Sequence, residues 1–212
     1  MGQDAVKPLR ALTWNDATTS ADWSLVQSCA AGDEAACTRL VADHQRMVYQ
    51  LALHLLGDPQ EALDLSQEVF LRVFRTLPQF RGQSALKTWI YRIVINQASN
   101  RQRWWRRRHK SQQVALEAHI EAHGDLPDQR GAALPDTLLR QKEVADGVWR
   151  ALNALPFDQR AVIVLREIDG LSYDEIADSL SVAVGTVKSR LARARGELRT
   201  ALLDMRKQGA TE

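Results

Sequence analysis

The sequence predicts an all-α protein made of two small helical domains joined by a flexible linker. Apolar residues recur at helical spacing from Trp23 to Arg108 and again from about Asp136 to Met205. Residues 111–136 lose this periodicity and gain glycine and proline. A chain of 212 residues that is 45% hydrophobic and 25% charged has a globular composition and enough length for two small domains.

We divide the chain into four segments. Residues 1–22 are predicted to be a poorly ordered tail, 23–110 a first helical domain, 111–136 the linker and 137–206 a second helical domain. The first domain should hold about four helices, because turn-forming residues interrupt the helical pattern at three places. These breaks are Ala31-Gly32-Asp33, Gly57-Asp58-Pro59 and Leu77 to Gly82.

The helix predicted around residues 64–77 has a buried side and a polar side. Its buried stripe consists of Leu65, Val69, Phe70, Val73, Phe74 and Leu77. The other side carries Asp64, Gln67, Glu68, Leu71, Arg72 and Arg75. The pattern leaves two interpretations of Leu71 open: an innocuous exposed leucine, or the apolar centre of a protein-docking patch with a polar rim.

The next predicted helix begins near Leu86 and also has two sides. Its core stripe consists of Leu86, Ile90, Ile93 and Val94. A second side carries Thr88, Arg92, Asn96, Ser99 and Arg103, with Trp89 at the border between the two. Short polar groups and arginines suit contacts with phosphates and base edges.

A long basic and aromatic segment covers both of these helices. Between Val69 and Lys110 there is no acidic residue, although the net charge of the whole chain is only +2. Its cations are Arg72, Arg75, Arg81, Lys87, Arg92, Arg101, Arg103, Arg106, Arg107, Arg108 and Lys110. Its rings are Phe70, Phe74, Phe80, Trp89, Tyr91, Trp104 and Trp105. Cations neutralise phosphates and flat rings stack on bases. The segment therefore predicts a surface that binds nucleic acid, including unpaired strands.

The second domain begins with an amphipathic helix and a helix that starts at Pro156. The first contains Leu138, Ala145, Val148, Trp149, Leu152 and Leu155. The second ends at Asp169-Gly170, where glycine supplies a left-handed stop. Ser172-Tyr173-Asp174-Glu175 then forms a capping box, which marks the start of a third helix.

A short break over residues 181–185 separates this third helix from a long basic one, which predicts a helix-turn-helix. The core seam of the long helix is Val187, Leu191, Ala194, Leu198 and Leu202. The residues expected to face DNA are Thr186, Lys188, Ser189, Ala192 and Arg193. Arg193 can donate two hydrogen bonds to guanine, and Arg190, Arg195 and Arg199 are placed for phosphates or the helix flanks.

Other classes of site find little support in the sequence. Cys29 and Cys37 do not match a metal signature and are expected to be reduced. His119, Glu121 and His123 are interpreted as solvated polar surface, so no metal or cofactor is expected. No set of residues at usable spacing indicates an enzyme. The chain lacks a signal peptide or a run long enough to span a bilayer, so we expect a cytoplasmic protein without membrane insertion.

Several strings, in order, resemble the extracytoplasmic-function (ECF, group 4) sigma factors of bacterial RNA polymerase, of the sigma-E type. The string from Asp64 to Phe74 looks like their polymerase-docking helix. Phe80-Arg-Gly-Gln-Ser, with Thr88-Trp-Ile-Tyr-Arg-Ile and Asn96, resembles their promoter-melting segment in sigma region 2. Leu155-Pro-Phe-Asp-Gln-Arg, Asp169-Gly-Leu-Ser-Tyr-Asp-Glu-Ile-Ala and Gly185-Thr-Val-Lys-Ser-Arg-Leu-Ala-Arg-Ala-Arg look like sigma region 4.

The resemblance implies a function and its partners. Asp64, Gln67, Glu68, Leu71 and Arg72 would bind core RNA polymerase. The loop Phe80, Arg81, Gly82, Gln83, Ser84 and Ala85 would receive a flipped base of promoter DNA, beside Thr88, Trp89, Arg92 and Asn96. Arg101 to Lys110 would grip duplex phosphates, and Thr186, Lys188, Ser189, Arg190, Ala192 and Arg193 would read the upstream element. An anti-sigma factor is expected as a further partner. The alternative is a stand-alone helix-turn-helix transcriptional regulator.

Overall fold

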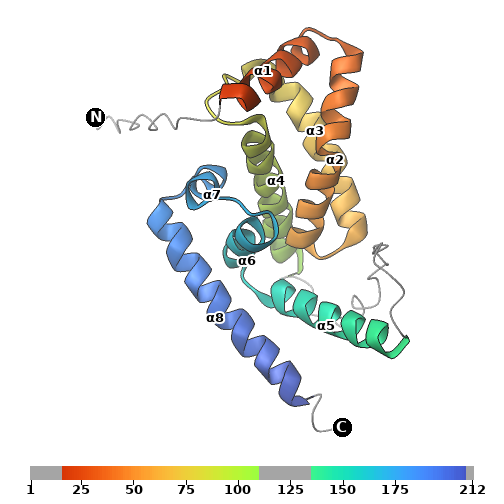
Figure 1. Ribbon diagram of the computed structural model, residues 1–212, viewed down its shortest axis with the longest axis vertical. Coiled ribbons are helices and arrows are strands. Elements are labelled where there is room, and N and C mark those ends of the chain that lie inside the picture. Colours follow the sequence, from red (N-terminus) through yellow and green to blue (C-terminus); the bar gives the residue numbers. More distant parts are fainter. Residues whose placement is uncertain (1–15, 110–134, 209–212) are drawn as a thin grey trace.

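The computed structural model describes residues 16–109 and 135–208, and every regular element in these two ranges is a helix. Helices α1 to α4 form one bundle, and α5 to α8 form a second group beside it (Figure 1). The predicted all-α class with two small helical domains is therefore confirmed. The linker predicted at 111–136 lies almost wholly outside the described residues.

The first two helices are α1, Asp16–Ala30, and α2, Glu34–Leu56. Helix α1 begins inside the segment predicted as tail, because packing of Val26 and Cys29 in the core supports a helix that local composition does not announce. Asp33 caps α2 by accepting hydrogen bonds from the amides of Ala35 and Ala36, at 2.9 and 3.2 Å.

A disulfide joins Cys29 and Cys37, whose Cα atoms are 4.9 Å apart. The prediction of a reduced pair is therefore wrong for this structure. The reason is the tight turn between α1 and α2, where Gly32 adopts a φ of +93° and brings the end of one helix against the start of the next. The bond fixes α1 to the bundle at its C-terminal end.

Helix α3, Pro59–Thr76, continues into the short 3₁₀ helix η1, Leu77–Gln79, and a loop leads to α4, Leu86–His109. Asp58 caps α3 by accepting from the Glu61 amide at 2.8 Å. The predicted core stripes are buried at Leu65, Val69, Val73, Leu77, Leu86, Ile90 and Val94, whereas Phe70, Phe74 and Ile93 are half-buried. The packing of α2, α3 and α4 thus holds α3 and α4 side by side.

The second group consists of α5, Pro135–Ala154; α6, Phe157–Ile163; the π-helical segment η2, Val164–Ile168; α7, Tyr173–Leu180; and α8, Val184–Gln208. Gly170, with a φ of +72°, follows η2 as predicted. The capping box is confirmed: the Glu175 amide donates to Ser172 Oγ at 3.2 Å and the Ser172 amide to Glu175 Oε2 at 2.8 Å. On the core seam of α8, Leu202 differs from the prediction because it is 37% exposed.

The two domains are packed against each other. Helix α7 lies against α4, and α6 lies beside the end of α2 (Figure 1). Arg160 is only 5% exposed and donates to the Leu55 carbonyl of the first domain at 3.0 Å, and also to Asn153 and Leu155. The rings of His54 and Trp149 meet at 4.7 Å between centroids. Among the described helices, none has the length and apolar character that a membrane span needs.

Candidate nucleic-acid interface

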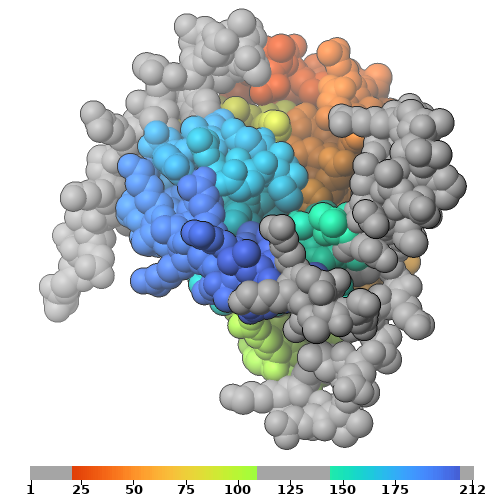
Figure 2. All heavy atoms as spheres, turned by 60° about the horizontal axis from the view of Figure 1, so that its bottom comes forward, coloured from red at the N-terminus to blue at the C-terminus, as the bar shows by residue number. Residues whose placement is uncertain are grey.

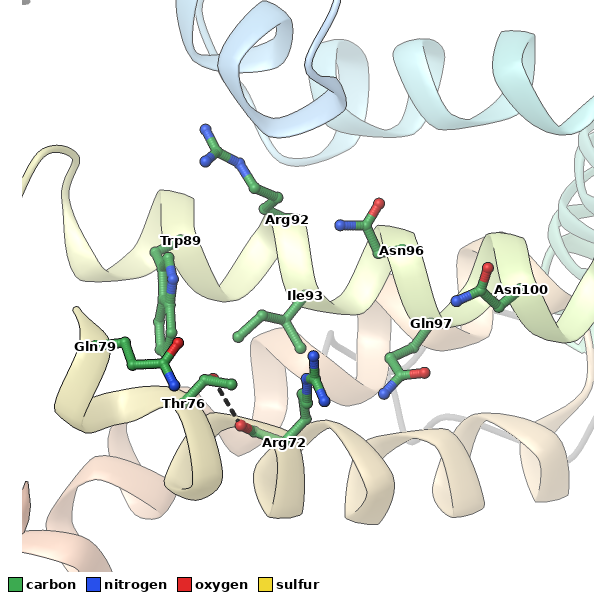
Figure 3. A pocket seen from close by; sticks show the side chains of 9 residues that line it. All are labelled: Arg72, Thr76, Gln79, Trp89, Arg92, Ile93, Asn96, Gln97 and Asn100. Carbon is green, nitrogen blue, oxygen red and sulfur yellow. Dashed lines mark hydrogen bonds between the residues drawn. The ribbon is translucent and has the colours of Figure 1, made fainter.

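A polar hollow of about 510 Å³ lies between α3 and α4 (Figure 3). Helix α4 provides one wall because Trp89, Arg92, Ile93, Asn96, Gln97 and Asn100 follow one another at helical spacing. The other wall is formed by Arg72, Thr76 and Gln79 of α3 and η1. The sequence prediction contains four of the nine lining residues: Arg72, Trp89, Arg92 and Asn96.

The lining of the hollow suits unpaired bases. Amide side chains can both donate to and accept from base edges, and Asn96, Gln97 and Asn100 present three of them along one helix. Trp89 is half-buried and offers a ring on which a base can stack. Helical spacing from Trp89 could have revealed Asn100, whereas Thr76 and Gln79 could not be found without knowing which face of α3 meets α4.

Arg92 points out of the hollow toward the second domain (Figure 3). Its Nε and Nη2 atoms donate to the carbonyl oxygen of Asp178, at 3.1 and 2.8 Å. Asp178 lies in the last turn of α7, where its carbonyl oxygen also accepts from the Ser181 amide at 3.2 Å and the helix dipole favours a cation. The contact brings the second domain over a residue that was predicted to hold DNA.

The loop between η1 and α4 is anchored at both ends. Phe80 is 9% exposed and its ring meets that of Trp89 at 5.2 Å between centroids. Ser84 is buried as well, while Arg81 and Gln83 are exposed. The polarity of Thr88 predicts a place on the solvent-facing side of α4. Thr88 is instead buried, with 3% of its surface exposed. The loop therefore presents its arginine and glutamine outward from a fixed base.

The exposed side of α3 carries the predicted docking residues. Asp64, Gln67, Glu68, Leu71 and Arg72 are all exposed, and the exposed fraction of Leu71 reaches 63%. Leu63 is 47% exposed and precedes Leu71 by two helical turns, so the apolar part of this surface is larger than predicted. The sequence signal for Leu63 is its spacing of eight residues from Leu71, which places both on one side of the helix.

Arg101 ties α3 to α4 instead of facing solvent. Its Nη1 atom lies 2.8 Å from Glu61 Oε2 and its Nη2 atom 2.7 Å from Glu68 Oε1. Both carboxylates of α3 neutralise Arg101 in this structure, so it would have to leave them to grip phosphates as predicted. The rest of the basic segment extends along the end of α4, which emerges in lime green at the edge of the molecule (Figure 2). There Arg103, Arg106 and Arg107 are exposed.

Helices α7 and α8 form the predicted helix-turn-helix. The turn is possible because Ser181 adopts a left-handed conformation, with φ of +55°, at the end of α7. Lys188, Ser189, Ala192 and Arg193 are exposed on α8, and Lys188 Nζ lies 5.6 Å from the centre of the Tyr173 ring. Thr186 is half-buried, with its carbonyl accepting from Ser189 Oγ at 3.0 Å.

Arg190 lies on the flank of α8, one of the two places that the sequence predicts for it. Its Nη2 atom lies 2.9 Å from Asp158 Oδ2 of α6, and its side chain is only 26% exposed. Arg195 likewise pairs with Glu167. Both arginines hold α8 to α6 and η2 in this structure.

Asp169 lies at the junction of the domains. Burial raises the pKa of its carboxyl to about 6, and Lys87 of α4 acts in the opposite direction. Its Oδ2 atom is buried and has no hydrogen-bond partner among the described residues. In turn, burial raises the pKa of Tyr91 on α4, and the charges of Asp169 and Glu175 add to this shift.

A helix-turn-helix and a basic, aromatic hollow in one all-helical chain define a two-domain DNA-binding protein. Comparison with known proteins gives the family. The model of sigma-70 region 2 matches residues 40–111 and that of sigma-70 region 4 matches residues 145–198. The chain is 37% identical over 187 residues to the RNA polymerase sigma-H factor of Pseudomonas aeruginosa, covering 87% of this chain and 95% of the relative.

It is also 40% identical over 176 residues to the ECF RNA polymerase sigma-E factor of Escherichia coli, covering 82% of this chain and 90% of the relative. The chain therefore belongs to the ECF sigma factors, which are transcription initiation factors of RNA polymerase. Because these matches span both domains, a sigma factor describes the chain better than the alternative of a stand-alone helix-turn-helix regulator.

Two solved structures share the fold. The sigma factor RpoE of Bartonella quintana, in complex with the anti-sigma factor NepR, has a TM-score of 0.62 and 26% identity, covering 78% of this chain and 95% of that one. CnrH, in complex with the cytosolic domain of CnrY, has a TM-score of 0.60 and 27% identity, covering 87% and 98%.

Proposed function

We propose that this sigma factor docks on core RNA polymerase through the exposed side of α3 and holds unpaired promoter bases in the hollow between α3 and α4. The observation that carries the proposal is that the two surfaces share one helix. Arg72 belongs to the docking side and also lines the hollow. Docking on polymerase thus brings the base-binding groups to the DNA that the enzyme holds.

The energies of melting and capture are of similar size. Opening a duplex costs about 1.4 kcal/mol per stacked step. Stacking a base on an aromatic ring returns about 1 to 3 kcal/mol. Trp89 supplies such a ring, and Arg81, Asn96 and Asn100 supply donors for phosphates and base edges. A few captured bases therefore suffice to keep a short bubble open.

The remaining surfaces set register on the duplex. Arg103, Arg106 and Arg107 at the end of α4 bind phosphates next to the bubble. Lys188, Ser189, Ala192 and Arg193 on α8 read the upstream element in the major groove. In this proposal the chemical reaction stays with the polymerase. The protein acts in the cytoplasm, together with the polymerase.

The packed arrangement of the domains is a resting state in this proposal. Arg92 donates from its Nε and Nη2 atoms to the Asp178 carbonyl, so α7 occupies the side of the guanidinium that would make a two-bond contact with a phosphate. Docking on polymerase separates α7 from α4 and frees Arg92. Two related structures are complexes with a regulator, NepR or CnrY. We extend this to the present chain, which binds an anti-sigma factor.

Permanganate footprinting of reconstituted holoenzyme tests the proposal. The wild-type protein with core polymerase should give reactive thymines near the start points of promoters selected from a genomic library. Asn96→Ala, on an exposed residue, should reduce that reactivity by about two- to tenfold through the loss of a hydrogen bond. Arg39→Ala, in an exposed ion pair with Asp43 on α2, is the control and should leave it unchanged. The proposal fails if wild-type holoenzyme gives no reactive thymines.

A further inference from the structure

Trp23 lies on α1 with 40% of its surface exposed, close to the base-receiving loop. Its ring centroid is 6.2 Å from that of Phe80, and the two planes are tilted by 40°. Aromatic pairs at this separation attract each other beyond the effect of burial alone. Trp23 thus touches the first residue of the loop from a helix that was not expected to contribute to DNA binding.

Trp23 also lies beside the place that a side chain at Gly82 would occupy. A Cβ atom built on Gly82 would lie 3.4 Å from the Cε3 and Cζ3 atoms of the indole, which is ordinary van der Waals distance. Gly82 adopts a φ of +66°, where glycine is favoured, and the chain turns there. The indole therefore covers the turn itself, between exposed Arg81 and Gln83.

The contacts continue into the hollow. Phe80 meets Trp23 on one side and Trp89 on the other, with the second pair of centroids 5.2 Å apart. Three rings from α1, the loop and α4 thus form one connected series. Trp89 lines the hollow that binds bases in the proposed function.

Helix α1 is a firm support for this series. Val26, one turn after Trp23, is 2% exposed, and Cys29 is bonded to Cys37 of α2. A side chain on an anchored helix can restrict a loop at little further cost in conformational entropy, because its own backbone is already ordered.

We propose that Trp23 is a positioning residue, which holds the loop Phe80 to Ala85 in the conformation that receives the flipped base. It does not itself touch DNA. The inference depends on the proposed function, since this loop supplies Arg81 and adjoins Trp89 of the hollow that binds unpaired bases. Without the indole, the loop samples other conformations and discriminates less well among the bases it captures.

Base discrimination in holoenzyme transcription tests the inference. Promoter variants with all four bases at each position of the downstream and upstream elements are transcribed with wild-type protein, Trp23→Ala, Trp23→Phe and Gln27→Ala. We expect Trp23→Ala to reduce discrimination at one downstream position by about three- to tenfold, the factor that an aromatic pair provides. Discrimination at the upstream element should stay as in the wild type. Trp23→Phe keeps a ring and should restore most of the preference.

The controls separate the possible failures. Gln27 is exposed on the same helix, and its replacement by alanine should behave as the wild type. Thermal unfolding and affinity for core polymerase show whether Trp23→Ala is folded, and Trp23→Leu replaces it if it is not. Unchanged downstream discrimination in a folded variant without a ring would overturn the role of Trp23. Absence of downstream discrimination in the wild type would instead overturn the proposed function.

Discussion

Arginine has three different roles in this chain, and its surroundings decide which. Arg160 is buried among carbonyl groups, and burial lowers its pKa to about 10, so it is charged at neutral pH. Arg101 is neutralised by two carboxylates of α3. Arg193 is exposed on α8. Only the third kind is ready to bind DNA, because the first two would have to leave partners in the protein.

Replacing Arg193 by alanine should change base preference rather than overall activity. A bidentate contact to guanine is worth about 1 to 3 kcal/mol of discrimination against the wrong base. We therefore expect Arg193→Ala to lose selectivity at one position of the upstream element. Transcription from a set of single-base promoter variants measures it. Arg199→Ala, on an exposed residue further along α8, is the comparison. A uniform loss over all promoter variants would contradict base readout by Arg193.

At the scale of elements, the pair α1 and α2 is held by a covalent bond. The disulfide between Cys29 and Cys37 joins positions eight residues apart in the sequence. A crosslink of this kind restricts the unfolded chain more than the folded one. It also holds α1 where Trp23 meets Phe80. The crosslink therefore supports the helix that carries Trp23.

Loss of the crosslink should lower the free energy of unfolding by about 2 to 3 kcal/mol. Cys37→Ser is the suitable change, because Cys37 is half-buried whereas Cys29 lies in the core. Urea unfolding of the wild type with and without dithiothreitol should show the same loss. The variant should not respond to dithiothreitol. A wild-type midpoint that is insensitive to dithiothreitol would show that the bond does not stabilise the protein.

Short sequence motifs predicted where the helices begin and end. The features that the sequence did not predict depend on contacts between residues far apart in the chain. The capping box at Ser172 and the stops at Gly57 and Gly170 each depend on a few neighbouring residues, so the sequence reveals them. The hollow needs α3 and α4 side by side, and Arg160 finds its partner Leu55 in the other domain. Such pairings depend on tertiary packing, for which a single sequence carries no local signal.

The same limit applies to the candidate residues. Exposed positions on α3 and α8 follow from helical spacing, which correctly separates the polar side from the core. Polarity alone misplaced Thr88, which is buried, and did not reveal the carboxylate partners of Arg101 and Arg190. A cation on a basic helix faces nucleic acid only where no acidic side chain of a neighbouring helix reaches it.

At the scale of the whole molecule, we expect the contact between the domains to respond to pH. The carboxyl of Asp169 has a pKa raised to about 6 by burial, with Lys87, Tyr91 and Glu175 as its charged or titratable neighbours. An exposed aspartate has a pKa of about 4. The closed form thus holds a proton between about pH 4 and 6 that the open form has lost, so closure is favoured at low pH.

As pH rises through 6 the carboxyl ionises in the closed form, and closure weakens. We expect the ratio of closed to open protein to fall between pH 5 and pH 8 by at most about tenfold, the value before partial solvent exposure reduces it. His54 stacks on Trp149 at the same contact, and burial lowers its pKa. Its titration therefore acts on closure in the opposite direction.

The variant Asp169→Asn separates the effects of Asp169 and His54, because it removes the carboxyl and leaves His54 in place. Small-angle scattering of the free protein over this range should show expansion with rising pH that is reduced or reversed in Asp169→Asn. Identical pH profiles for the two proteins would rule out Asp169 as the group that couples pH to domain closure.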